Sequence, residues 1–152
     1  RPSADQLVTR KLTDYRLALY ASRAYLARNP PIEKREDLSA HAWIDYVDDL
    51  LFSQELKFLN SFCRSPRVVF HSTSVIAQHQ AARSGLGIAV LPCFMAAGDG
   101  ELVPLLPAEG IQRSYWISSR RELHKSVRLR VLWDYVVELC AREQGLLLGE
   151  SR

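Results

Sequence analysis

The chain has 152 residues, of which 47% are hydrophobic and 24% are charged, and its formal net charge is +3. This composition is typical of a globular protein with a packed core, arranged as one domain or two small lobes, and the charge by itself does not indicate nucleic-acid binding. No apolar run approaches the roughly 20 residues that span a bilayer, and no signal-peptide core follows Arg1. Since the sequence starts without Met, we expect it to be part of a longer protein.

The cysteines indicate the redox environment. Cys63, Cys93 and Cys140 are odd in number and far apart in the sequence. This pattern favours reduced thiols in a cytoplasmic protein over a disulfide framework. No Cys-x-x-Cys motif or His/Cys cluster is present, so we expect neither a metal site nor a cofactor.

Short runs of β-prone residues predict the strands. They cover residues 7–12 and 15–20 with a turn at Asp14, then 43–46, 67–70, 88–91, 102–106 and 112–119. Pro104 favours an edge position for the run at 102–106. Helices are predicted from caps, breakers and apolar spacing. They cover residues 23–28, 33–38, a segment capped at Asp48, Asp49 or Ser53 that runs through Phe62, then 75–84 and 126–142, with a frayed tail from 145 to 152. Strands and helices alternate, which predicts the α/β class.

The most informative segment runs from His71 to Pro92, HSTSVIAQHQAARSGLGIAVLP. Its pattern predicts a strand end, a hydroxyl-rich helix start at Ser72, Thr73 and Ser74, a glycine stop at Gly85 and a second strand. A strand, a helix and a strand in this order predict a parallel pair joined by a right-handed crossover. Ligands of open α/β sheets bind at the carboxyl ends of strands, where free amides at a helix start attract anions. The three hydroxyls are therefore either plain helix caps or part of an anion site.

Three ordered segments resemble the effector-binding domain of the LysR-type transcriptional regulators. They are LYASRAYLARNPPIEKREDLSAHAWIDY at 19–46, STSVIAQHQAARSGLGIAVLPCF at 72–94, and GELVPLLP at 100–107 followed by YWISSRRELHKSVRLRVLWDYVVE at 115–138. The resemblance implies a type II periplasmic-binding-protein-like fold with two lobes and a ligand cleft, in which the first lobe is incomplete. It implies a first lobe at 1–45 and 124–152, a second lobe at 46–123, and hinges near 44–47 and 119–123.

The resemblance also implies a sensory function without catalysis. A small metabolite, expected to be a carboxylate, would bind with its anionic end at Ser72, Thr73 and Ser74. Tyr20, Ala21 and Ser22 would face it from the other lobe, and Phe94 would wall the pocket. The effector would control DNA binding by an N-terminal helix-turn-helix outside this sequence. The full-length regulator is expected to be a homo-oligomer without a membrane partner.

Other interpretations remain open at this point. A solute-binding protein for carboxylate transport would share the fold and the anion site. A Cys–His hydrolase could use Cys93 and His71, although no nucleophile motif or orienting acid accompanies them, and a buried inert thiol is the simpler interpretation. The basic run from Arg120 to Arg130 could contact DNA phosphates, but a solvated connection is the favoured interpretation.

Overall fold

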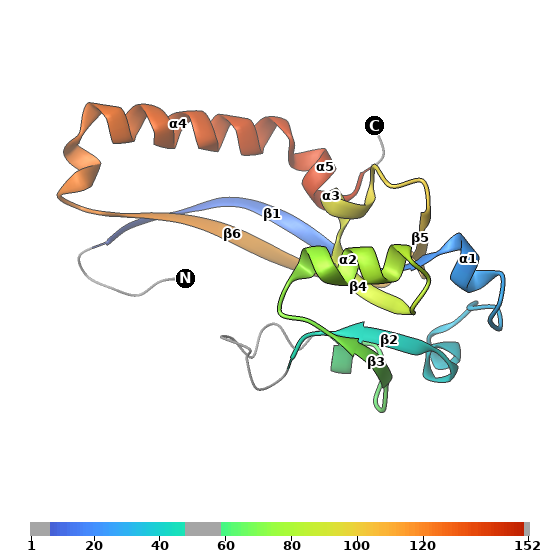
Figure 1. Ribbon diagram of the computed structural model, residues 1–152. Coiled ribbons are helices and arrows are strands. Elements are labelled where there is room, and N and C mark those ends of the chain that lie inside the picture. The colour runs from blue at the N-terminus through green and yellow to red at the C-terminus, as the bar shows by residue number, and fades with distance from the viewer. Residues whose placement is uncertain (1–6, 48–58, 151–152) are drawn as a thin grey trace. The chain divides into compact units, whose positions relative to one another are not determined.

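The computed structural model describes residues 7–47 and 59–150 (Figure 1). The chain forms two compact units, one of Arg1–Arg16 with Gln112–Arg152 and the other of Leu17–Ile111, called here the terminal unit and the central unit. This division does not identify either unit with a lobe of the family, so the lobes at 1–45 with 124–152 and at 46–123 stay a prediction. The start of the predicted helix through Phe62 lies outside the described residues, and its end is a 3₁₀ turn, η4, at Leu59–Ser61.

Six strands form one sheet in the order β3-β2-β4-β1-β5, with β6 also paired to β1. The strands are β1 (Leu7–Ser22), β2 (Ala42–Asp45), β3 (Arg67–His71), β4 (Ile88–Pro92), β5 (Leu102–Leu105) and β6 (Ile111–Arg120). The predicted edge position of the Pro104 strand is confirmed, because β5 ends this order. The α/β class is confirmed as well.

The central unit contains the parallel part of the sheet. Strands β3 and β4 both run parallel to β2, which lies between them. The prediction that β3 and β4 are parallel is thus correct, but the expectation that they pair directly is wrong. The β2 strand, which precedes both in the sequence, takes the position between them. Strand β1 runs antiparallel to β4, with Leu17 opposite Pro92 and Tyr20 opposite Ala89.

Helix α2 (Val75–Arg83) connects β3 to β4 and covers one face of the central sheet. Its C-terminus is a Schellman motif, in which the N–H groups of Gly85 and Leu86 donate to the carbonyls of Ala82 and Ala81 at 3.0 and 3.1 Å. Gly85 has a φ of +83°, the left-handed conformation that glycine adopts without strain. The predicted glycine stop is therefore confirmed.

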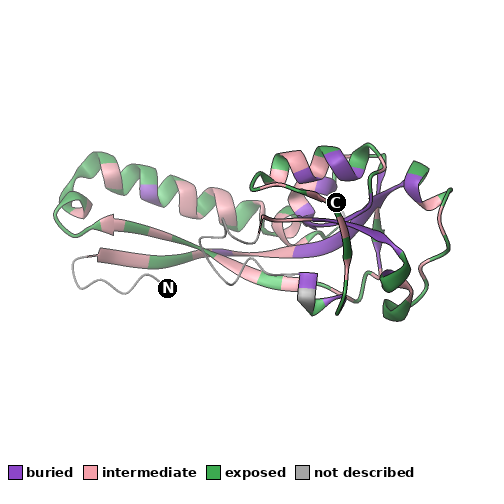
Figure 2. Ribbon diagram, turned by 60° about the horizontal axis from the view of Figure 1, so that its bottom comes forward, coloured by how far each residue is buried: buried purple, intermediate pink, exposed green. Residues whose placement is uncertain are grey.

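The core under α2 uses small side chains, so that the helix lies close to the strands. Its members come from four strands, α2 and the short helix α3 (Cys93–Ala96): Ala18, Tyr20, Ile44, Ala81, Ala82, Ala89, Leu91, Cys93, Ala96 and Leu102. Figure 2 shows this buried region along the strands of the central unit. The alternate residues of β4, Ile88 and Val90, are also buried, as expected for a strand covered on both faces.

Short elements precede β2 in the central unit. They are α1 (Arg23–Leu26) and the 3₁₀ helix η1 (Arg35–Ala40). The indole N–H of Trp43 donates to the carbonyl of Leu38 at 3.2 Å, and both side chains are fully buried. Gly87 lies directly against β2, since a Cβ at this position would come within 2.5 Å of the Ala42 carbonyl oxygen.

The terminal unit combines the first part of β1 with β6, the 3₁₀ turn η5 (Leu123–Lys125), α4 (Val127–Arg142) and α5 (Gln144–Leu148). The predicted turn at Asp14 is wrong, because β1 continues through it. The Asp14 carboxylate accepts hydrogen bonds from Lys11 Nζ at 2.8 Å and from Ser114 Oγ of β6 at 2.5 Å, which satisfies it within the strand pair. The tail predicted to fray from 145 instead continues in α5 as far as Leu148, followed by the C-cap Gly149 in a left-handed conformation, and its last two residues lie outside the described residues.

Candidate functional site

The carboxyl ends of β2, β3 and β4 lie at the same edge of the central sheet, because these three strands are parallel. Directly after them come Tyr46, Ser72 and Cys93. The N-terminus of α2 lies at this edge as well, since the helix follows β3 after three residues. This is where open α/β sheets bind ligands.

The three hydroxyl residues before α2 have different roles. Ser74 is the N-cap, and its Oγ accepts from the Ala77 N–H at 3.4 Å. Ser72 Oγ accepts from the Ser74 N–H at 3.1 Å, and the Ser72 carbonyl accepts from Gln78 Nε2 at 2.8 Å. Capping is thus shown for Ser74, whereas Ser72 forms hydrogen bonds just before the helix begins. Both serines still have a hydroxyl proton to donate to a ligand.

Thr73 differs from Ser72 and Ser74 in its hydrogen bonding. It is exposed, and among the described residues its hydroxyl has no recorded hydrogen bond. The amides of Val75 and Ile76 belong to the first helical turn, which offers no acceptor within the helix. A hydroxyl and two amides are therefore available at a helix start that solvent reaches.

Strand β1 places Tyr20, Ala21 and Ser22 away from this edge. Tyr20 lies opposite Ala89 in the antiparallel pair, so the strand runs on toward the beginning of β4. Ser22 is 1% exposed and caps α1 by accepting from the Tyr25 N–H at 3.2 Å. The expectation that these residues face Ser72–Ser74 is not met, because the antiparallel direction of β1 carries them to the opposite end of the sheet. Their assignment to a ligand stays a prediction.

Phe94, Cys93 and His71 lie at the expected edge. Phe94 belongs to α3, directly after β4, and is partly buried. Cys93 is 2% exposed, whereas the His71 ring is exposed and its Nδ1 lies 3.0 Å from the Tyr46 carbonyl oxygen. Within residues 7–47 and 59–150 no contact joins this thiol to this imidazole. The arrangement offers no nucleophile and base pair.

Sequence reasoning missed Asp45 and Tyr46 as members of this edge. The Asp45 carbonyl accepts from the Ser72 N–H at 3.0 Å, so the end of β2 lies next to the hydroxyl segment. Polar residues directly after the apolar run Trp43-Ile44 were the available signal. Their importance depends on the strand order, which only the structure shows.

In the described part of the chain, no group of three or more His, Cys, Asp or Glu side chains is arranged to hold a metal ion. None of the described helices has the length and apolar character needed to cross a membrane.

Known proteins resemble the chain over most of its length. The family model of the LysR substrate binding domain matches residues 1–141. The HTH-type transcriptional regulator CrgA of Neisseria meningitidis serogroup C (strain 8013) is 28% identical in an alignment of 144 residues, and the match covers 87% of this chain and 46% of CrgA. The chain thus spans about half the length of this curated relative.

Solved structures agree with this match. The regulatory domain of CrgA from Neisseria meningitidis superposes with a TM-score of 0.75 at 25% identity, over 91% of this chain and 71% of that one. The full-length regulator LysG of Corynebacterium glutamicum, solved with bound effector Arg, gives 0.71 at 21% identity, over 93% and 49%. LysR regulatory domains have the periplasmic-binding-protein-like two-lobed fold. The chain belongs to the LysR substrate binding domain family.

Proposed function

We propose that this domain binds a small anionic metabolite at the N-terminus of α2 and thereby controls DNA binding by an N-terminal helix-turn-helix of a cytoplasmic, homo-oligomeric regulator. The observation that supports the proposal is the Thr73 hydroxyl next to the first amides of α2, those of Val75 and Ile76, none of which has a hydrogen-bond partner in the part of the chain that the structure describes. These groups are all hydrogen-bond donors, and the helix dipole adds positive potential at the same place.

A carboxylate is the ligand class that suits such donors. Its two oxygens accept several hydrogen bonds from backbone amides and hydroxyls, and each bond to an ionised group is stronger than a neutral one. LysG, which shares the fold, was solved with the amino acid Arg as its effector. The family match favours a regulator over a solute-binding protein, and the proposal requires no covalent step.

Binding must be coupled to a change of state. A ligand shifts an equilibrium between two arrangements only by the difference between its affinities for them. We propose that the effector favours one arrangement of the domain and that the DNA-binding part responds to it. Phe94, at the same sheet edge, is the proposed apolar contact for the rest of the ligand.

The test uses the full-length regulator with Ser72→Ala and Thr73→Ala combined. We expect the effector response in a promoter–reporter assay to be abolished while DNA affinity is unchanged. Ser84→Ala is the matched control, because Ser84 is an exposed hydroxyl residue at the other end of α2. Unchanged induction in the double variant, or an equal loss in the control, would refute the assignment.

The ligand itself can be sought with the 152-residue chain. A thermal-shift screen of organic acids and amino acids should identify a compound that raises the unfolding temperature, because binding to the native state stabilises it by mass action. The same compound should give no shift with the double variant. A compound that shifts both proteins equally would place the binding site elsewhere.

A further inference from the structure

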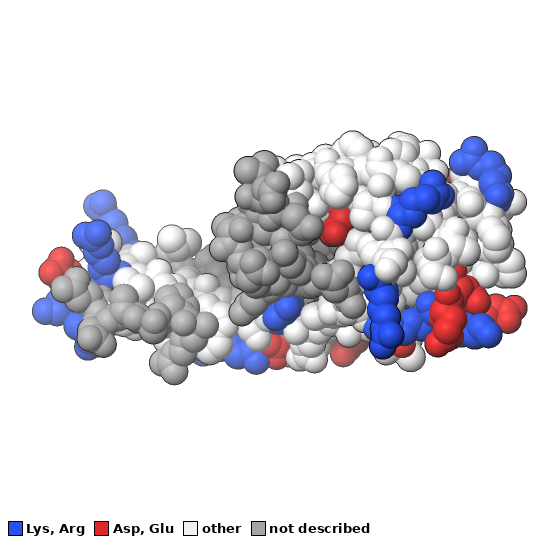
Figure 3. Space-filling model, turned by 90° about the horizontal axis from the view of Figure 1, so that it is seen from below, with Lys and Arg blue, Asp and Glu red and all other residues white. Residues whose placement is uncertain are grey.

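The turn between β6 and α4 carries a dense group of cations, called here the basic turn: Arg120, Arg121, Lys125, Arg128 and Arg130. Glu122 is the one acid between Arg120 and Arg130, so this segment has a formal charge of +4, which exceeds the +3 of the whole chain. All five cations are exposed. Figure 3 shows several Lys and Arg side chains at the left edge of the view, where Figure 1 places this turn.

No acid neutralises the basic turn within the described residues. None of its five cations has a recorded ion pair or hydrogen bond there. The first turn of α4 contains no acidic residue, and the N-cap Ser126 makes no side-chain cap. Cations beside the positive end of a helix dipole are unfavourable. An anionic partner would relieve this repulsion.

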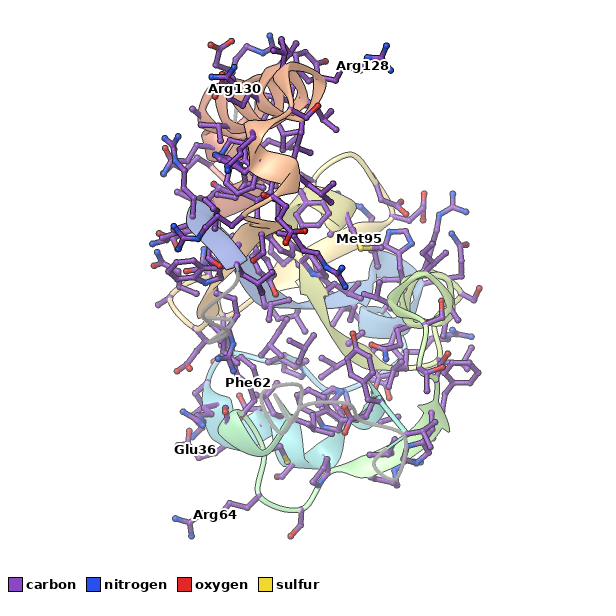
Figure 4. The ribbon with its side chains drawn as sticks, turned by 90° about the vertical axis from the view of Figure 1, so that its left-hand side faces the viewer. Glu36, Phe62, Arg64, Met95, Arg128 and Arg130 are labelled. Carbon is purple, nitrogen blue, oxygen red and sulfur yellow. The ribbon has the colours of Figure 1, made fainter. Side chains whose placement is uncertain are left out.

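Contacts with a buried tryptophan and a neighbouring serine hold the basic turn in place. His124 packs edge-on against Trp133, with ring centroids 4.8 Å apart, and its Nδ1 lies 3.2 Å from Ser119 Oγ. Trp133 is 5% exposed and is the one buried residue of α4. The cations therefore extend from a fixed turn rather than a loose loop, and Figure 4 shows Arg128 reaching away from the ribbon.

We propose that the basic turn binds the phosphate backbone of DNA. Four of its cations are arginines, whose planar guanidinium groups match phosphate oxygens in pairs, and the free amides at the start of α4 add donors. This inference rests on the proposed function in one respect, which is the choice of DNA as the anionic partner. The contact would be independent of sequence, since phosphates position a protein without specifying bases.

The experiment measures binding of the 152-residue chain to a labelled duplex of arbitrary sequence by fluorescence anisotropy between about 50 and 200 mM salt. We expect weak, salt-dependent binding with a dissociation constant of about 10⁻⁴–10⁻⁶ M. The triple variant Arg121→Gln, Lys125→Gln and Arg128→Gln should weaken binding and reduce the salt slope by about 0.9 for each lost contact. Arg128→Gln alone, at an exposed position, serves if the triple variant does not fold.

The matched control removes the same charge elsewhere: Lys34→Gln, Arg64→Gln and Arg67→Gln, all at exposed positions of the central unit. This control variant should bind the duplex with the same salt dependence as the parent chain. Equal losses in both triple variants, no binding by the parent chain at 50 mM salt, or tighter binding to anionic lipid vesicles than to the duplex would each overturn the proposal. No effector is present, so these outcomes are independent of the site at Ser72–Ser74.

Discussion

At the scale of single residues, His41 shows how burial sets a protonation state. Its side chain is fully buried, and the Tyr25 hydroxyl accepts from the Ala42 N–H at 2.9 Å while lying 3.1 Å from His41 Nδ1. The Tyr25 hydroxyl and His41 Nδ1 share one hydrogen bond, whose direction depends on the tautomer of the ring, and the buried Nε2 has no partner among the described residues. Burial lowers the pKa of His41, against the smaller opposing effect of Asp37.

This lowered pKa predicts acid sensitivity of folding. The unfolded chain takes up the proton near pH 6.5, whereas the folded chain resists it, so His41 contributes stability above about pH 6.5 that is lost as the pH falls further. The unfolding temperature should drop between about pH 7.5 and 5.5. His41→Gln keeps a hydrogen-bond partner for Tyr25 but does not titrate, so it should flatten this dependence. A variant with the parent profile would contradict the assignment.

Gly87 predicts a steric effect at one backbone contact. The Cβ of an alanine would meet the Ala42 carbonyl oxygen at 2.5 Å, so β2 and β4 would have to move apart. We expect Gly87→Ala to reduce the free energy of unfolding by about 1–3 kcal/mol, as for other overpacked sites. Urea denaturation measures this. Gly98→Ala is the control, because no atom lies within 4 Å of its added Cβ, and an equal loss there would show that packing is not the cause.

At the scale of elements, local signals predict α2 well and β1 poorly. The Ser74 cap and the Gly85 stop are local, and the predicted helix at 75–84 differs from Val75–Arg83 by one residue. The long β1 depends on Ser114, one hundred positions away in the sequence, which pairs with Asp14. A distant partner of this kind leaves no local pattern. The strand order, which separates Tyr20–Ser22 from Ser72–Ser74, also leaves no local pattern in the sequence.

The cap of α2 gives a prediction for the element itself. Ser74→Ala removes the acceptor of the Ala77 N–H, and the expected loss is about 1 kcal/mol in the free energy of unfolding. Thr73→Ala should leave stability within about 0.5 kcal/mol, because the Thr73 side chain is exposed. Chemical denaturation of both variants separates capping from ligand binding at neighbouring positions. A larger loss for Thr73→Ala than for Ser74→Ala would reverse these roles.

At the scale of the whole molecule, the sequence predicted the class, the family and the parallel strands. It did not predict how much of α4 is exposed to solvent. The apolar residues along one face of this helix, called here the stripe, are largely solvent-exposed: Val127, Val131, Leu132 and Tyr135 are 56–65% exposed. Periodicity identifies an apolar face without saying what covers it. Ordinary protein surfaces carry single, scattered apolar residues, whereas these four exposed apolar side chains lie together on one helix.

The exposed stripe predicts the behaviour of this chain in solution. We expect concentration-dependent association, or binding of a dye that fluoresces on apolar surfaces, because contiguous exposed apolar side chains gain free energy when water is excluded. Val131→Lys combined with Tyr135→Lys should reduce both signals. Ile76→Lys is the control: Ile76 is 65% exposed on α2, as much as Val127, but lies outside the stripe. Sedimentation measures the association, and a monodisperse monomer that binds no dye would show that the stripe is covered in solution.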